Sequence, residues 1–119
     1  MKKVYTLSTC DTSRKILKKV SLSELNFEII DIKSSAITEE DLDEMHKLSG
    51  TYEALFSKRS QKYKSLGLKD VKLTETDYKK LILSEYTFLK RPVIIDNNKI
   101  FIGNSKINQE ALWKHLGII

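Results

Sequence analysis

The apolar, β-branched segments of this chain gather toward its two ends, and this distribution constrains the fold more than any other feature. Near the N-terminus, two strand-like segments, Lys3–Ser8 and Phe27–Ile32, flank Thr12–Val20, in which apolar residues recur at helical spacing. A strand, a helix and a second strand in this order predict a β-α-β unit with parallel strands and a right-handed crossover.

The C-terminal third predicts an antiparallel hairpin and a closing helix. Segments Pro92–Asp96 and Lys99–Ile102 are rich in apolar β-branched residues. They are joined by Asn97-Asn98, two residues that tolerate the left-handed backbone of a tight turn. A final helix is expected over 107–116, ending at Gly117, with Ala111 and Leu112 pointing inward.

The middle of the chain is more polar and predicts several short helices. Two helices are expected to begin at capping boxes, the first ending at Ser49-Gly50 and the second containing Tyr86. These capping boxes are Thr38-Glu39-Glu40-Asp41 and Thr74-Glu75-Thr76-Asp77. Between them, Tyr52–Ser57 and Gln61–Leu66 are interpreted as two further helical pieces, with Gly67 closing the latter.

The order of these elements predicts an α/β fold of the thioredoxin-like type. It consists of a β-α-β part and a β-β-α part with a helical insertion, about 36–88, between the halves. A length of 119 residues with 40% hydrophobic residues suits one core, so we expect a single domain over 1–119.

Charge and cysteine content limit the classes of function. The formal charge is +5, but lysines occur throughout the chain and form no long basic run, which favours a solvated basic surface over direct nucleic-acid binding. We expect no membrane span, because no long apolar stretch is present. The same absence of a long apolar stretch leads us to expect a cytoplasmic location. A single cysteine excludes the internal disulfides typical of small secreted domains.

The cysteine lies where a strand is expected to meet a helix, in Cys10-Asp11-Thr12-Ser13-Arg14. A helix N-terminus favours an anion and lowers the pKa of a thiol, and Arg14 adds a positive charge, while Asp11 opposes it. Ser13 occupies the place of the second cysteine in a dithiol motif, so it can donate a hydrogen bond to a thiolate but cannot resolve a mixed disulfide. This pattern predicts monothiol chemistry, although a lone cysteine can also be a small buried hydrophobe.

Other residues carry less information. His46 and His115 have no Cys, Asp or Glu at metal-ligand spacing, so we expect no metal site. The Lys58-Arg59 pair is compatible with either a solvated charged face or an anion site.

Three motifs in register resemble the arsenate reductase/Spx family over nearly the whole chain. They are Cys10-Asp11-Thr12-Ser13-Arg14-Lys15, Leu55-Phe56-Ser57-Lys58-Arg59-Ser60 and Lys90-Arg91-Pro92-Val93-Ile94-Ile95, with Ile102-Gly103-Asn104 after the hairpin. The resemblance implies a glutaredoxin-linked, arsenate-reductase-like oxidoreductase in which Cys10 is the nucleophile. Glutathione would be its co-substrate, with no bound cofactor, and a small oxyanion or thiol compound its substrate.

The resemblance also implies a substrate-binding set, and this sequence departs from part of it. Ser13 and Arg14 complete the Cys-x-x-Ser-Arg turn, and Thr12, Arg59, Arg91 and Pro92 are the implied anion-binding residues. The proline is expected to be cis and to lie beside the cysteine.

The departures fall at three positions. The family's arginine in the helical segment aligns with Ser57, next to Lys58 and Arg59; its third arginine is replaced around Ile102-Gly103; and its histidine four residues before the cysteine is Thr6 here. Loss of bidentate guanidinium contacts is expected to weaken arsenate binding.

The Spx branch of this family supplies an alternative function. Its members bind the C-terminal domain of the RNA polymerase alpha subunit and regulate transcription, commonly through a Cys-x-x-Cys switch. Ser13 excludes that switch here. Binding without a switch is expected to involve the Ser49-Gly50-Thr51 turn.

Overall fold

The computed structural model describes residues 2–7, 9, 11–20 and 25–117, without the side chains of residues 11, 12, 17, 19 and 20. The chain forms two compact units. Met1–Ser35 and Arg91–Ile119 make up the first, which we term the sheet unit, and Ala36–Lys90 make up the second, the helical unit.

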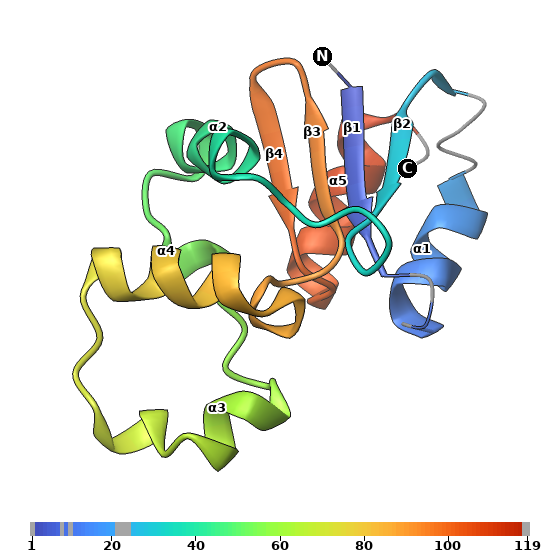
Figure 1. Cartoon of the computed structure of the whole chain (residues 1–119). Coiled ribbons are helices and arrows are strands. Elements are labelled where there is room, and N and C mark those ends of the chain that lie inside the picture. Colours follow the sequence, from blue (N-terminus) through green and yellow to red (C-terminus); the bar gives the residue numbers. More distant parts are fainter. Residues whose placement is uncertain (1, 8, 10, 21–24, 118–119) are drawn as a thin grey trace. The chain divides into compact units, whose positions relative to one another are not determined.

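The sheet unit contains a four-stranded sheet with the strand order β2-β1-β3-β4 (Figure 1). The strands are β1 (Lys2–Thr6), β2 (Glu28–Asp31), β3 (Val93–Asp96) and β4 (Lys99–Ile102). Strands β1 and β2 pair in parallel, whereas β1 with β3 and β3 with β4 pair antiparallel. The predicted β-α-β unit and hairpin are both confirmed.

Two helices of the sheet unit supply side chains to the same apolar core. Val4, Ile94 and Phe101 are cross-strand neighbours on one face of the sheet. They cluster with Ile16 of α1 (Asp11–Val20) and Leu112 of α5 (Lys106–His115). Tyr5, Val93 and Ile95 alternate onto the opposite face and are buried as well.

Helix α5 confirms one inward residue and corrects another. Leu112 is buried, but Ala111 is exposed, contrary to the prediction. Neighbouring residues on a helix are about 100° apart, and the half-buried Trp113 and Leu116 lie on the side of Leu112 away from Ala111. Gly117, with φ 77°, follows the helix as predicted.

The helical unit consists of three α-helices and three short 3₁₀ turns within its described residues. The α-helices are α2 (Glu39–Ser49), α3 (Gln61–Ser65) and α4 (Glu75–Ser84); the turns are η2 (Glu53–Leu55), η3 (Leu68–Asp70) and η4 (Tyr86–Phe88).

Both capping boxes form as predicted. Thr38 Oγ1 accepts from the Asp41 amide at 3.1 Å, and the Thr38 amide donates to the Asp41 carboxylate at 3.1 Å. At α4, the corresponding Thr74–Asp77 distances are 3.2 and 2.9 Å. Gly50 ends α2 with φ 87°, a backbone conformation that favours glycine.

An aromatic cluster forms the core of the helical unit. The Phe56 ring stacks on Phe88 with centroids 5.1 Å apart and contacts Tyr78 at 4.9 Å and Tyr63 at 5.9 Å. Buried aromatic rings of this kind contribute a large apolar area to a small core.

Two predicted helical segments are shorter than expected. Helix α4 ends at Ser84, because Glu85 is extended (φ −151°, ψ 120°), so Tyr86 lies in η4 and not in the helix. In Tyr52–Ser57 only Glu53–Leu55 is helical, since Phe56 forms a β-bridge with Leu89. The second deviation arises from a contact between segments that are distant in sequence.

Candidate functional site: the edge of the sheet where β1 ends

The C-terminal end of β1 lies at the end of the sheet where β2 and β4 also end and β3 begins. We call this end of the sheet the sheet edge. Tyr5 is paired with Val93, so the antiparallel register continues with Thr6 opposite Pro92. On the far side of Pro92, the Gly103 amide donates to its carbonyl at 2.8 Å. On the other side of β1, Thr6 pairs with Asp31. The edge is therefore formed by Asp31, Thr6, Pro92 and Gly103.

The predicted nucleophile follows this edge in sequence. Cys10 lies outside the described residues, so its predicted role stays a prediction. The residue after it, Asp11, begins α1. Thr12 lies in the first turn of this helix, and its side chain is not among those that the structure describes.

Ser13 and Arg14 differ in environment. Ser13 is fully buried in the first turn of α1. Arg14, one residue later, is exposed. Ser13 can therefore act only on groups inside the fold, whereas the charge of Arg14 is accessible from solvent.

Arg91 and Pro92 connect the two units at the entry to β3. Their peptide bond is cis, as expected from the resemblance, and Pro92 is buried. The Arg91 side chain is half-buried, and its Nε and Nη1 atoms are buried without a hydrogen-bond partner in the described part of the chain. A guanidinium stays charged in proteins, so buried donors without partners leave desolvation uncompensated and favour a bound anion.

Thr6 carries a second unpartnered group at this edge. The residue is 4% exposed. Its Oγ1 atom is buried and has no hydrogen-bond partner among the described residues. Its backbone carbonyl accepts from the Ile32 amide at 2.9 Å, which fixes the residue in place. In the sequence, Thr6 stands out only as a departure from the family pattern. Its four-residue spacing from Cys10 is the feature that could have identified it as a site residue.

The loop after β4 is held by a side chain that the sequence analysis missed. Asn108 of α5 accepts from the Ile102 amide at 3.2 Å and donates to the Gly103 carbonyl at 2.8 Å. Gly103 is buried with φ 84°. The turn at which the resemblance implied a third arginine therefore contains a buried glycine.

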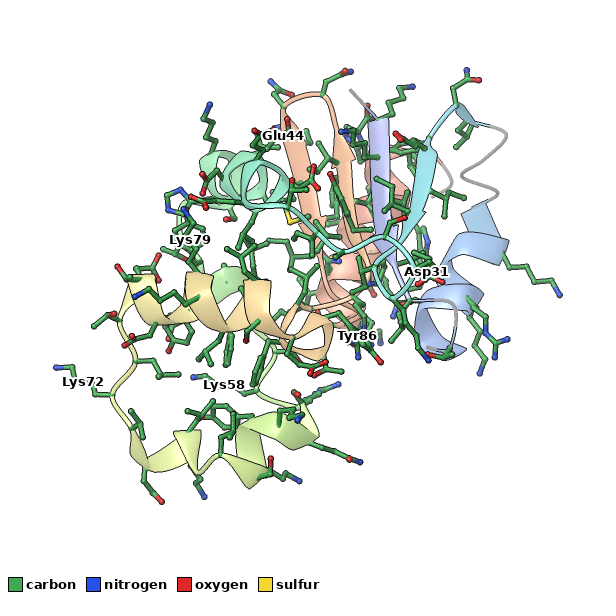
Figure 2. All side chains as sticks on the ribbon, viewed as in Figure 1. Asp31, Glu44, Lys58, Lys72, Lys79 and Tyr86 are labelled. Atoms are coloured by element: carbon green, nitrogen blue, oxygen red, sulfur yellow. The ribbon has the colours of Figure 1, made fainter. Side chains whose placement is uncertain are left out.

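Asp31, at the end of β2, accepts hydrogen bonds from the residues that follow it in the chain (Figure 2). Its Oδ1 accepts from the Lys33 amide at 3.0 Å, and its Oδ2 accepts from the Ser34 hydroxyl at 3.4 Å. These bonds close the turn after β2 and engage both carboxylate oxygens at this edge.

The remaining predicted arginine belongs to the other unit. Arg59 and its neighbour Lys58 are exposed in the helical unit, whereas Arg91 belongs to the sheet unit. The segment that carries Arg59 is fixed by a hydrogen bond from the Ser57 amide to the Phe88 carbonyl at 2.7 Å.

A polar network in the helical unit was not predicted. The Tyr52 hydroxyl donates to Asp43 Oδ1 at 2.6 Å, and Lys79 Nζ lies 3.0 Å from the same oxygen. The Tyr52 hydrogen bond, followed by that of Lys79, lowers the pKa of Asp43, while the Asp43 hydrogen bond raises the pKa of Tyr52. His46 stacks on Tyr52 at 4.1 Å. The network joins α2, the segment before η2 and α4.

The described residues contain neither a metal-binding cluster nor a membrane-spanning helix. Within the described ranges, no three His, Cys, Asp or Glu side chains are grouped so that they could hold a metal ion. None of the described helices combines the length and the apolar character that crossing a bilayer requires.

Comparison with known proteins gives a consistent result. Residues 5–112 match the ArsC family. The global transcriptional regulator Spx 2 of Bacillus anthracis is 26% identical over 115 residues, covering 95% of this chain and 85% of that protein. YusI of Bacillus subtilis, an uncharacterized protein, is 26% identical over 112 residues, 92% and 95% of the two chains.

The fold is shared with solved structures. An arsenate reductase from Vibrio cholerae superposes with a TM-score of 0.75 at 18% identity, covering 93% of this chain and 94% of that one. This likeness confirms the thioredoxin-like arsenate reductase fold. Since the family match extends over most of the sequence, the chain belongs to the ArsC family.

Proposed function

We propose that this protein is a monothiol oxidoreductase that acts on a small oxyanion, with Cys10 as nucleophile and glutathione as co-substrate. The observation that carries the proposal is the Arg91 guanidinium, with two buried nitrogens that lack partners among the described residues. Its neighbour Pro92 follows the register opposite Thr6, the last residue of β1. Thr6 precedes Cys10 by four residues. A buried cationic donor without a partner suits an anionic substrate.

The proposed chemistry balances with a thiol as reductant. The Cys10 thiolate forms a sulfur–arsenic bond with arsenate, and one arsenate oxygen leaves as water after protonation. A glutathione thiolate then attacks the Cys10 sulfur, and the electron pair of the sulfur–arsenic bond passes to arsenic, which leaves as arsenite. A further thiol, from glutathione or glutaredoxin, reduces the mixed disulfide.

Each residue of the site has a distinct proposed role. Arg91 binds the oxyanion, and Thr6 offers a hydroxyl donor at the same sheet edge. Ser13 and the backbone at Thr12 stabilise the thiolate, while Arg14 supplies positive charge at the start of α1. Arg59 is proposed as a further residue that binds an anion, either the oxyanion or a glutathione carboxylate.

The first test is a glutathione- and glutaredoxin-coupled arsenate reductase assay on the wild type and on Cys10→Ser. Because the chain has one cysteine, the pH dependence of iodoacetamide alkylation reports the pKa of that thiol alone. We expect activity only in the wild type and a thiol pKa below its ordinary value.

The outcomes separate substrate from mechanism. A low thiol pKa without arsenate turnover would support a reactive thiol but overturn arsenate as the substrate. A thiol that titrates and reacts like a free cysteine would overturn the whole mechanism.

A second candidate is a binding module of the Spx type. It is supported by the 26% identity to Spx 2 and by the glycine turn at the position of the third arginine. This module would bind the C-terminal domain of the RNA polymerase alpha subunit through the Ser49-Gly50-Thr51 turn. Gly50 is exposed there, and the Ser49 hydroxyl donates to the Thr51 carbonyl at 2.9 Å.

The two candidates respond differently to loss of the thiol. Binding of the alpha C-terminal domain to the second candidate persists in Cys10→Ser, whereas oxidoreductase activity does not. Calorimetric titration of that domain into wild type and variant distinguishes them, and absence of a complex at micromolar concentrations would remove the second candidate.

A further inference from the structure

The net positive charge of this chain lies in one segment, although lysines occur throughout the sequence. Residues 58–72 contain six basic side chains and one acidic one, Asp70, so they have a formal charge of +5. This equals the formal charge of the whole chain, and the rest of the sequence is balanced. The basic side chains are Lys58, Arg59, Lys62, Lys64, Lys69 and Lys72.

All six side chains are exposed and available to a partner. Among the described residues, ion pairs are formed by Lys79 and by His115, for example, but by no residue of 58–72. Figure 2 shows Lys58 and Lys72, which mark the two ends of the segment, with Lys72 directed away from the ribbon.

The fold holds this segment in a defined conformation. Ser60 caps α3 by accepting from the Lys62 amide at 3.3 Å, and its hydroxyl hydrogen-bonds Thr87 at 2.8 Å. Tyr63 packs its ring against Phe56 of the aromatic core. The cations are therefore presented on an ordered surface, which reduces the entropy lost on binding.

Two large aliphatic side chains are exposed among these cations. Leu66 is 57% exposed and Val71 is 51% exposed, on either side of η3. Phosphate backbones offer no apolar contact for such groups, whereas protein interfaces combine an apolar centre with a polar, charged rim. The composition of the segment thus favours a protein partner over a nucleic acid.

We propose that residues 58–72 form a docking surface for an acidic protein, one that presents carboxylates around a small apolar spot. Carboxylates of the partner pair with the lysines and accelerate association, and Leu66 and Val71 fill the apolar spot. The surface does not depend on Cys10, so its test is independent of the proposed reaction.

The test uses a defined probe, a short fluorescein-labelled peptide of glutamates with two central leucines, followed by fluorescence anisotropy. We expect binding that weakens as salt is raised, and about tenfold weaker binding in Lys62→Glu/Lys64→Glu/Lys69→Glu. Leu66→Ser/Val71→Ser should weaken binding of this peptide, and a peptide with serines in place of the leucines should bind the wild type equally poorly.

The matched control is Lys33→Glu/Lys99→Glu/Lys106→Glu, which makes the same change in net charge at exposed positions of the sheet unit. It should bind the peptide nearly as the wild type does, and circular dichroism checks that each variant is folded. The proposal is overturned if the peptide does not bind, or if the control weakens binding equally. It is also overturned if a mixed-sequence DNA duplex or phosphatidylserine vesicles bind more tightly than the peptide, or if Leu66→Ser/Val71→Ser has no effect.

Discussion

The sheet unit and the helical unit differ in whether their polar side chains have hydrogen-bond partners. In the helical unit, polar side chains are satisfied within the unit: both capping boxes are closed, and Glu75 accepts from the amides of Tyr52 and Glu53 at 2.7 and 3.2 Å. At the edge of the sheet unit, Thr6 and Arg91 bury polar atoms that have no partner among the described residues.

This contrast separates polar groups that maintain the fold from those available for a ligand. A satisfied hydrogen bond contributes about 1 kcal/mol, whereas an unsatisfied buried polar group costs about 1–3 kcal/mol. Glu44 Oε1 is an exception in the helical unit, but that residue is half-buried on α2. Thr6 and Arg91 lie next to one end of the sheet, and their cost agrees with the anion site proposed above.

Among substitutions that leave Cys10 intact, the largest effect is expected at Arg91. Arg91→Met removes the oxyanion donors and should lower kcat/KM about 100-fold, the loss expected for a charge-assisted contact. Stability should not fall, because a buried cation without a partner is replaced by an apolar side chain of similar length.

Lys90→Met is the matched control, because Lys90 is an exposed neighbouring cation. Its steady-state kinetics and urea unfolding should stay close to wild type. Strong destabilisation in Arg91→Met would instead identify Arg91 as part of a structural ion pair.

The next effect concerns Thr6. Thr6→Val keeps the shape of the side chain and removes a buried hydroxyl, so the free energy of unfolding should rise by about 1 kcal/mol. Reductase activity should fall about tenfold if the hydroxyl donates to the oxyanion or the thiolate. Thr6→Ser retains the hydroxyl and should retain most activity, whereas a Thr6→Val enzyme with full activity would remove Thr6 from the site.

Local signals in the sequence predicted most of the fold. Each capping box depends on residues three apart, and the hairpin turn lies in Asn97-Asn98, where Asn97 has φ 56°. The end of α4 at Ser84 could not be predicted in this way. There Glu85 takes an extended conformation, and the next segment bonds to a distant one, because the Phe88 carbonyl accepts from the Ser57 amide at 2.7 Å.

The candidate site was less accessible to sequence reasoning. Arg91 and Pro92 were identified through the family resemblance, and Cys10 stays a prediction because it lies outside the described residues. The roles of Thr6 and Asn108 depend on burial and on hydrogen-bond partners supplied by other strands and loops. Those properties exist only in the folded chain.

A smaller effect is expected in the helical unit. Thr74→Ala removes the side-chain half of the α4 capping box, which should lower the free energy of unfolding by about 1 kcal/mol. Thr76→Ala is the matched control, because Thr76 is an exposed threonine in the same helical turn. Urea unfolding of the full chain measures both, and reductase activity should be unchanged in both. Equal effects of the two substitutions would contradict a role for the cap.

The smallest effect is a pH dependence at Asp43. Hydrogen bonds from Tyr52 and Lys79 lower the pKa of Asp43 below its ordinary value of 3.8, so the unfolded chain binds a proton there more readily than the folded chain. The stabilisation is therefore present above pH 3.8 and lost as the pH falls through the lower pKa of the folded state. Asp43→Asn should be less stable than wild type above pH 3.8, and this difference should shrink below it.

Two further variants identify the cause of that pH dependence. Tyr52→Phe removes the largest contribution and should move the pKa of Asp43 back toward 3.8, which NMR titration of the carboxyl measures. Glu40→Gln controls for removal of an exposed carboxylate from α2. If Tyr52→Phe leaves the titration of Asp43 unchanged, the Tyr52 hydrogen bond does not stabilise that carboxylate. Hydrogen bonds within the helical unit would then not by themselves distinguish its polar groups from those of Thr6 and Arg91.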